Sequence, residues 1–212
     1  MGKLWTFGDS CTESFTGFSP EYVNWKGYIP KVYGEIISEK LGLMLENFGK
    51  SGISNYQIFQ NVCDNIEKIN HEDIIIISWT QIHRFRLVND ENEWQLFYNS
   101  EKEILRSLKK CKYISNNTID EIIFNRMVHE NKYSEEIRSW EKIIRTSFAK
   151  NNMVFWSPFN DAIYGSLWLK LETIKIETKN IIVDPHFSEY GQIQLSNILL
   201  ERLGMISDKT II

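Results

Sequence analysis

The chain has 212 residues, of which 42% are hydrophobic and 25% charged, and its formal net charge is −4. This composition excludes wholesale disorder, and the length suits one medium-sized domain that can bury a hydrophobic core. The mildly acidic balance argues against nucleic acid or an anionic membrane surface as a partner.

No apolar run approaches the roughly 18 residues of a membrane span. The N-terminus leads straight into an apolar strand pattern rather than a signal peptide, so we expect a cytoplasmic protein. The 3 cysteines are too few, and odd in number, for a disulfide scaffold. No His, Cys and Asp spacing is typical of a metal site, and we expect neither a metal nor a cofactor.

The first part of the chain predicts strands that alternate with helices. Residues 4–7 form a short apolar run, typical of a buried strand, and apolar positions at helical spacing lie between Pro30 and Gly42. Residues 43–48 predict a second strand. A loop rich in glycine and serine follows, and a second helical pattern covers residues 58–69.

The later part of the chain continues this alternation. Four consecutive isoleucines at 74–77 predict a strand that is covered on both faces, as in a parallel sheet. Residues 153–156 and 181–183 predict a fourth and a fifth strand. Ser188 is a suitable N-cap for a last helix that ends at Gly204. The alternation favours an α/β fold with a parallel sheet.

The segment from about 86 to 150 has a different character. It is polar and rich in Asn, Lys and Glu, and helical patterning is clearest over 134–150. It is also longer than one crossover connection requires. We interpret it as a helical insertion after the third strand, inside a single domain that covers residues 1–212.

Residues able to perform nucleophilic catalysis follow two of the predicted strands. Ligands of open parallel sheets bind beyond the carboxyl ends of the strands, where Ser10, Asp184 and His186 would meet. A serine hydroxyl needs a base to take its proton, and an imidazole needs an acceptor on its other nitrogen. An oxyanion also needs donors, for which the N–H groups of Ser10 and of a glycine in the 49–52 loop are suitable.

Three blocks in chain order resemble those of the SGNH (GDSL-type) hydrolases. The Phe-Gly-Asp-Ser run ending at Ser10 resembles the first block, and the Asn-x-Gly-x-Ser-Gly turn ending at Gly52 looks like the second. The Asp184-x-His186 pair looks like the last. The resemblance covers residues 7 to about 204. It implies a three-layer α/β/α sandwich with a flavodoxin-like parallel sheet of about five strands, and no metal.

The resemblance also implies roles for these residues. Ser10 would be the nucleophile, His186 the general base and acid, and Asp184 the group that orients His186. Gly52 would donate the second oxyanion hydrogen bond beside the N–H of Ser10. The family hydrolyses esters and thioesters of lipids and acylated sugars. We expect a serine esterase that forms an acyl-enzyme from short acyl esters of small molecules or glycans, with O-acetyl groups on carbohydrate as first candidate.

The third block departs from the family pattern. Thr80 stands where the family has an asparagine whose side chain donates to the oxyanion, and loss of such a donor costs about 3 kcal/mol. Either Thr80 or Gln81 takes over this donation, or activity is low. The alternative function is therefore a weak or inactive SGNH-fold protein with a binding or structural role. A nucleotide-binding flavodoxin-like domain is disfavoured, because the first strand–helix turn lacks a good phosphate loop.

Several residues after the first and third strands are weaker candidates for contacts with a substrate: Asp9, Trp79, Gln81, His83 and Arg84. The cationic members would suit an anionic substrate group, although arginine is also a common structural clamp. Tryptophans near the site, such as Trp25, would suit stacking on a sugar, although core packing is the commoner use. Cys11 is an alternative nucleophile that the block pattern disfavours.

Overall fold

The computed structural model describes residues 2–81, 84–88, 94–97, 130–158, 167–168, 171–177 and 181–206. A five-stranded sheet lies at the centre with strand order β2-β1-β3-β6-β7, and every neighbouring pair in it is parallel. This order confirms the expected flavodoxin-like arrangement. The strands are β1 Lys3–Gly8, β2 Met44–Gly49, β3 Ile74–Ser78, β6 Asn152–Ser157 and the short β7 Leu167–Trp168.

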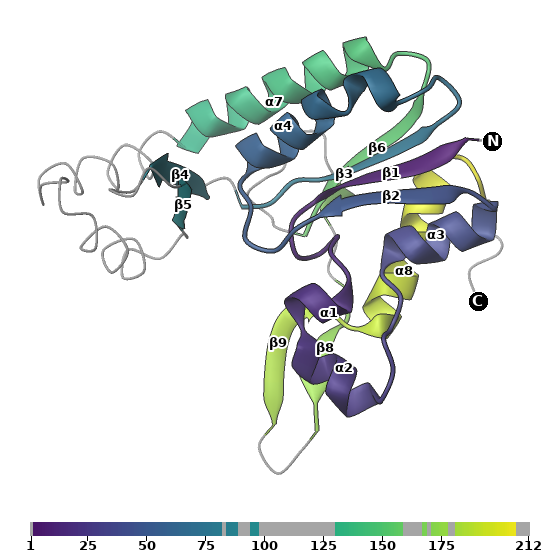
Figure 1. The fold of residues 1–212 in the computed structure, drawn as a ribbon, viewed down its shortest axis with the longest axis vertical. Helices are drawn as coiled ribbons and strands as arrows, with labels where there is room; N and C mark the ends of the chain where they lie inside the picture. The colour runs from purple at the N-terminus through teal and green to yellow at the C-terminus, as the bar shows by residue number, and fades with distance from the viewer. Residues whose placement is uncertain are drawn as a thin grey trace, which may run out of the picture.

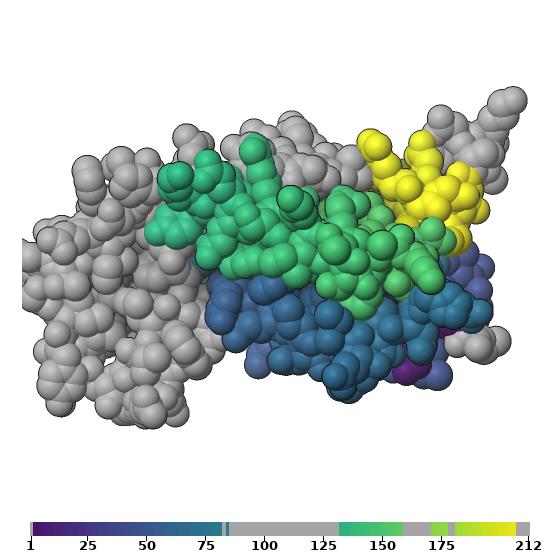
Figure 2. All heavy atoms as spheres, turned by 90° about the horizontal axis from the view of Figure 1, so that it is seen from above, coloured from purple at the N-terminus to yellow at the C-terminus, as the bar shows by residue number. Residues whose placement is uncertain are grey.

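Helices cover both faces of this sheet (Figure 1). On one face lie α4 Asn55–Asp64 and α7 Glu130–Ser147, and on the other lie α3 Tyr33–Leu41 and α8 Glu189–Arg202. Figure 2 looks onto the first face and shows α4 and α7 side by side across it. The fold is therefore the three-layer α/β/α sandwich that the SGNH resemblance implies.

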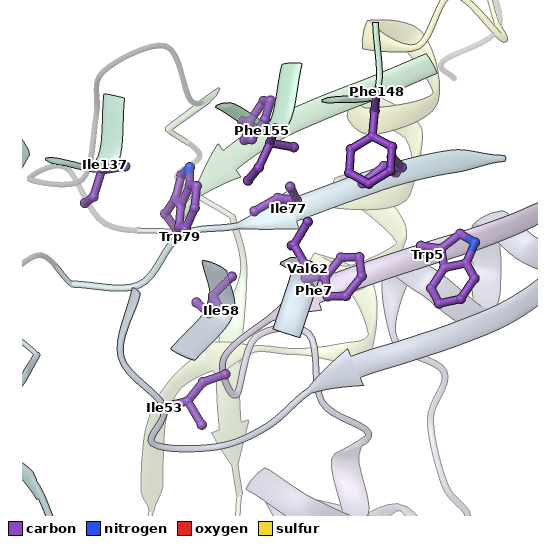
Figure 3. Close-up of a cluster of buried hydrophobic side chains, with 12 residues drawn as sticks. Trp5, Phe7, Ile53, Ile58, Val62, Ile77, Trp79, Ile137, Phe148 and Phe155 are labelled. Carbon is purple, nitrogen blue, oxygen red and sulfur yellow. The ribbon is translucent and has the colours of Figure 1, made fainter. Parts of the chain in front are cut away.

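The isoleucine run of β3 explains why both faces need a cover. Ile75 and Ile77 point into the core under α4 and α7, whereas Ile74 and Ile76 belong to the core on the other face. All four are at most 5% exposed, as the two-residue period of a strand requires. Figure 3 shows the first of these cores, in which Trp79 also lies. Each such side chain contributes roughly 1.5–3 kcal/mol by its burial.

The ends of α3 and α8 follow the sequence signals. The Ser188 hydroxyl accepts a hydrogen bond from Gly191 N at 3.1 Å, which confirms the predicted N-cap of α8. Gly42 and Gly204 follow α3 and α8 with φ angles of 64° and 70°. These left-handed conformations suit glycine and stop each helix where the sequence predicts.

The strand predicted at 181–183 exists, but it does not join the main sheet. It is part of β9 Ile182–Phe187, which pairs antiparallel with β8 Thr173–Ile176 in a separate two-stranded sheet, and β7 takes the fifth place in the main sheet. Ile182 and Val183 are 45% and 69% exposed. A short apolar run alone does not distinguish such a half-open hairpin from a covered strand.

Two short helices lie between β1 and α3, where the sequence predicts no helix. They are α1 Phe15–Phe18 and α2 Pro20–Lys26, and Pro20 stands at the first helical position, where its missing N–H costs nothing. Phe15 and Tyr22 pack against the isoleucines of β8. We call α1, α2, β8 and β9 the hairpin lobe; it lies beside the sandwich in Figure 1.

The expected helical insertion at 86–150 is only partly described. Its first part forms the antiparallel pair β4 Phe85–Val88 and β5 Trp94–Phe97 rather than a helix. The helix expected over 134–150 is present as α7, but Ile137, Ile144 and Phe148 pack it into the main core as a layer of the sandwich. Residues 98–129 lie outside the described residues, and an insertion there stays a prediction.

Candidate active site

Ser10 lies in a tight turn directly after β1. The N–H groups of Thr12 and Glu13 both donate to the carbonyl of Asp9, at 3.0 and 3.1 Å. This turn holds Ser10 at the carboxyl edge of the sheet. The Oγ atom of Ser10 lies 2.7 Å from Nε2 of His186, although the two residues are 176 positions apart in the chain.

The second ring nitrogen of His186 faces Asp184. Nδ1 lies 2.5 Å from Oδ1 of Asp184, and the backbone N–H of His186 donates to the same oxygen at 3.0 Å. Both residues stand on β9, where positions two apart point to the same side. The two-residue spacing of this pair is therefore suited to a strand, and Ser10, His186 and Asp184 form one hydrogen-bonded chain.

The carboxylate of Asp184 is stabilised in its charged form. Burial acts to raise its pKa, but the hydrogen bonds from His186 and the hydroxyl of Ser19 outweigh burial, and the pKa lies below its ordinary value of 3.8. Ser19 Oγ donates to Oδ2 at 3.0 Å. Asp184 is thus an anion near neutral pH and can hold a proton on Nδ1 of His186.

Two residues of the hairpin lobe complete this arrangement, and the sequence analysis missed both. Phe18 packs its ring on that of His186 with a centroid separation of 4.8 Å, and Ser19 binds Asp184 as described above. Both stand 165 or more positions from their partners. No local pattern marks them, because their role comes from the tertiary packing of α1 and α2 against β9.

The loop from 49 to 52 packs directly against the Ser10 turn. A Cβ atom on Gly49 would lie 2.4 Å from both the carbonyl carbon of Thr12 and the nitrogen of Glu13, so only glycine fits there. The Glu13 carboxylate accepts hydrogen bonds from the N–H and the hydroxyl of Ser51. Gly52 has a φ angle of 78°, which glycine adopts without strain.

The structure gives Thr80 a different partner from the oxyanion. Its hydroxyl is fully buried and donates to Oδ2 of Asp9 at 2.6 Å. The Asn55 side chain accepts from Thr80 N at 2.7 Å and donates to Thr80 O at 2.9 Å. The Thr80 proton is committed to Asp9, and we leave Thr80 out of the oxyanion donors considered below.

The weaker candidates for substrate contacts differ in their burial and in their hydrogen-bond partners. Asp9 is fully buried, and Arg84 Nη1 donates to its carboxylate at 2.9 Å. Trp79 lies in the core and donates from its indole nitrogen to Glu141 at 2.8 Å. Gln81 is half-buried, and His83 lies outside the described residues. Asp9 and Trp79 are therefore not offered to a substrate.

Cys11 does not have the environment of a nucleophile. It is 5% exposed, and burial, with the charge of Asp9 as the next cause, raises the pKa of its thiol well above the ordinary value. The thiolate, which is the reactive form, is strongly disfavoured. Exposure does not separate the two residues, since Ser10 is 6% exposed, but Nε2 of His186 lies 2.7 Å from Oγ of Ser10, and this contact favours Ser10 as the nucleophile.

A cavity of about 710 Å³ lies along the hairpin lobe. Its lining includes Trp25 and Lys26 of α2, Thr173 of β8 and the helix cap Ser188, which is two residues from His186. Within the described ranges, no three His, Cys, Asp or Glu side chains converge as a metal site would require. None of the described helices is long and apolar enough to cross a membrane.

Comparison with known proteins finds similarity in structure only. No family model matches the chain, and no curated protein matches its sequence. The chain is similar to a lipase from a goat rumen metagenome, with 15% identity over 76% of this chain and a TM-score of 0.36. It is also similar to an acetyl xylan esterase from Butyrivibrio proteoclasticus, with 10% identity over 97% of this chain and a TM-score of 0.46.

A third similar structure is a lipolytic protein of the G-D-S-L family from Desulfitobacterium hafniense. It has 13% identity over 95% of this chain and 99% of its own, with a TM-score of 0.37. The chain spans 65% of the length of each of the first two structures.

Proposed function

We propose that the chain is a serine ester hydrolase of the SGNH type. The observation that carries the proposal is the hydrogen-bonded chain from Ser10 through His186 to Asp184. Ser10 Oγ attacks the acyl carbonyl carbon while Nε2 of His186 takes its proton. The tetrahedral intermediate collapses as His186 returns that proton to the departing alcohol, and an acyl-serine remains. Water, deprotonated by His186, then releases the acid and restores Ser10.

Asp184 serves this cycle by its charge and its position. It keeps the proton of the neutral imidazole on Nδ1, so that Nε2 faces Ser10 as an acceptor. When His186 becomes positively charged, the adjacent carboxylate stabilises it. Ser19 and the backbone of His186 hold that carboxylate in place.

We assign the oxyanion donors to the backbone N–H groups of Ser10 and Gly52. The close packing of the 49–52 loop against the Ser10 turn supports this assignment. Thr80 donates to Asp9 instead. Because one donor is typically worth a hundred- to a thousandfold in rate, a two-donor site should turn over more slowly than a three-donor site.

The preferred substrates are short acyl esters of small molecules or glycans, with O-acetyl groups on carbohydrate first. Trp25 of α2 lines the cavity on the lobe that carries His186 and is 45% exposed, and Tyr28, just after α2, is 51% exposed. Exposed aromatic rings of this kind offer flat apolar faces to a sugar. No membrane span or nucleic acid enters the proposal.

A fluorophosphonate probe tests the nucleophile directly. The wild type should be labelled, Ser10→Ala should not be labelled, and His186→Ala should be labelled far more slowly. Cys11→Ala is the matched control and should react like the wild type. Hydrolysis of p-nitrophenyl acetate, butyrate and octanoate then gives the acyl preference, with acetate expected to be fastest. Absence of wild-type labelling, or equal labelling of Ser10→Ala, would overturn the proposal.

The second candidate is a weak or inactive member that binds a ligand in the same place. The engagement of the Thr80 hydroxyl by Asp9 favours it, because Thr80 then does not take the place of the family's third oxyanion donor. Such a protein would be labelled slowly or not at all and would hydrolyse none of the p-nitrophenyl esters. Turnover that disappears in Ser10→Ala would exclude it.

A further inference from the structure

A buried ion pair lies directly beneath the proposed nucleophile. The carboxylate of Asp9, the residue before Ser10, is fully buried, and the side chain of Arg84 is 10% exposed. Arg84 Nη1 and Thr80 Oγ1 both donate to Oδ2 of Asp9, at 2.9 and 2.6 Å, while Cys11 N donates to Oδ1 at 3.1 Å. Burying such a pair adds little net stability compared with an apolar pair of similar volume. The pair therefore calls for another role.

The Nη1 atom of Arg84 that binds Asp9 also contacts the loop that carries Gly52, the second proposed oxyanion donor. Arg84 Nη1 lies 3.5 Å from the carbonyl oxygen of Ile53, the residue after Gly52. One atom thus stands between the residue that precedes Ser10 and the residue that follows Gly52. Arg84 itself is held near the third strand, where its N–H donates to Gln81 O at 3.2 Å.

The geometry points to Arg84 as a positioning residue for the oxyanion hole; this inference rests on the proposed function. By binding Asp9 and Ile53 together, Arg84 sets the distance between the backbone N–H groups of Ser10 and Gly52. Thr80, which replaces the family's side-chain donor, supports the same carboxylate. The third block thus contributes to the site through Asp9 rather than by direct donation to the oxyanion.

Arginine suits this position better than lysine. Its planar guanidinium presents several N–H groups in fixed directions and keeps its charge when buried, whereas an ammonium is a compact point charge. Arg84→Lys should keep the ion pair with Asp9 and lose the reach to Ile53. Arg84→Gln should lose both the ion pair with Asp9 and the contact with the Ile53 carbonyl. Asp9→Asn should remove the negative charge of the ion pair instead of the positive one.

The test compares kcat, KM and the affinity of an alkylboronic acid, which forms a tetrahedral adduct with a catalytic serine. Arg84→Gln should lower kcat about a hundredfold, leave KM within about twofold, and weaken boronic acid binding by a similar factor to kcat. Arg84→Lys should fall between Arg84→Gln and the wild type. Added guanidinium ion should restore part of the activity of Arg84→Gln. The double variant Asp9→Asn/Arg84→Gln should lose little more than Arg84→Gln, because the two residues act together.

The matched control removes a positive charge far from the site. Arg202 lies at the far end of α8, about 20 Å along the helix from Ser188. Arg202→Gln should leave kcat, KM and boronic acid affinity unchanged. Thermal unfolding of every variant shows which of them are folded at the assay temperature. If Arg84→Gln is unfolded there, Arg84→Lys takes its place in the comparison.

Three results would overturn the inference. A higher KM with unchanged kcat would make Arg84 a substrate contact. A lower melting temperature with unchanged kcat and boronic acid affinity would make it purely structural. Failure of the wild type itself to react with the fluorophosphonate probe would instead remove the proposed function, and the role of Arg84 with it.

Discussion

Replacement of Gly49 with alanine should slow the proposed chemistry while the protein stays folded. The added Cβ would lie 2.4 Å from backbone atoms of Thr12 and Glu13, whereas ordinary contact begins near 3.4 Å. Neither neighbour is a flexible side chain, so the 49–52 loop must move away from the Ser10 turn by about 1 Å, and a shift of that size in a positioned group costs about a hundredfold in rate. The strain should cost about 1–3 kcal/mol of stability.

The assay measures kcat/KM for p-nitrophenyl acetate and the labelling rate with a fluorophosphonate, together with thermal unfolding. Gly42→Ala is the control, because no atom lies within 4 Å of a Cβ added at Gly42, although its φ angle of 64° makes alanine unfavourable there. It should cost about 1 kcal/mol of stability and no activity. If folded Gly49→Ala reacts at the wild-type rate, the close approach of the loop does not set the position of the oxyanion donors.

Substitutions at two further residues, Asp184 and Glu141, test groups whose pKa values are displaced. Asp184→Asn should lower kcat by about ten-thousandfold, because the imidazole loses the partner that fixes its tautomer. The folded pKa of Asp184 lies below its unfolded value near 3.8, so its contribution to stability is complete above that value and is lost as the pH falls through the folded pKa. Melting temperatures at pH 5 and pH 3 should therefore differ less for Asp184→Asn than for the wild type. Burial raises the pKa of Glu141, whose carboxylate accepts from Trp79. Glu141→Gln should keep that acceptor and match or exceed wild-type stability at pH 8, whereas Glu141→Ala should lose about 1–3 kcal/mol by leaving the indole N–H unpaired in the core. Equal melting temperatures for these two variants would contradict the role assigned to Glu141.

The parts of the fold that follow from periodicity could be predicted from the sequence. A run of β-branched residues such as 74–77 has few uses other than a strand that is covered on both sides. The serine–histidine–aspartate arrangement could also be expected, because Ser10 follows the first strand of a parallel sheet and its partners stand two residues apart near the C-terminus. Strand position and residue type together limit where such groups can meet.

The hairpin lobe could not be predicted, since nothing local distinguishes it. Residues 181–183 are apolar enough for a central strand, yet Val183 is 69% exposed. What places β9 outside the main sheet is its pairing with β8 and the cover from α1 and α2. Phe18 and Ser19 take their roles from that packing, because their neighbours in the sequence give no hint of His186 or Asp184.

The hydrogen-bond partner of Thr80 could not be predicted from the sequence either. From the sequence, Thr80 was expected to be a weaker oxyanion donor, because it stands where the SGNH family has an asparagine with a longer side chain. The structure instead brings its hydroxyl to Asp9, 71 residues away, where Arg84 also binds. For Arg84 the sequence left open a substrate contact or a structural clamp, and the structure shows it bound to Asp9, an anion of the protein itself.

The residues of the proposed site come from two parts of the fold, the main sheet and the hairpin lobe, and this division should be visible in the kinetics. Ser10 and the 49–52 loop belong to the edge of the main sheet, whereas Asp184 and His186 belong to the hairpin lobe. The hydrogen bond between Ser10 and His186 crosses from one part to the other. Substitutions beneath the sheet edge, at Arg84 or Gly49, should weaken oxyanion stabilisation and leave proton transfer intact. Substitutions in the lobe, at Ser19 or Phe18, should disturb His186 and change the pH dependence of kcat. The two groups of variants should therefore be separable by boronic acid affinity in one case and by the pH profile in the other.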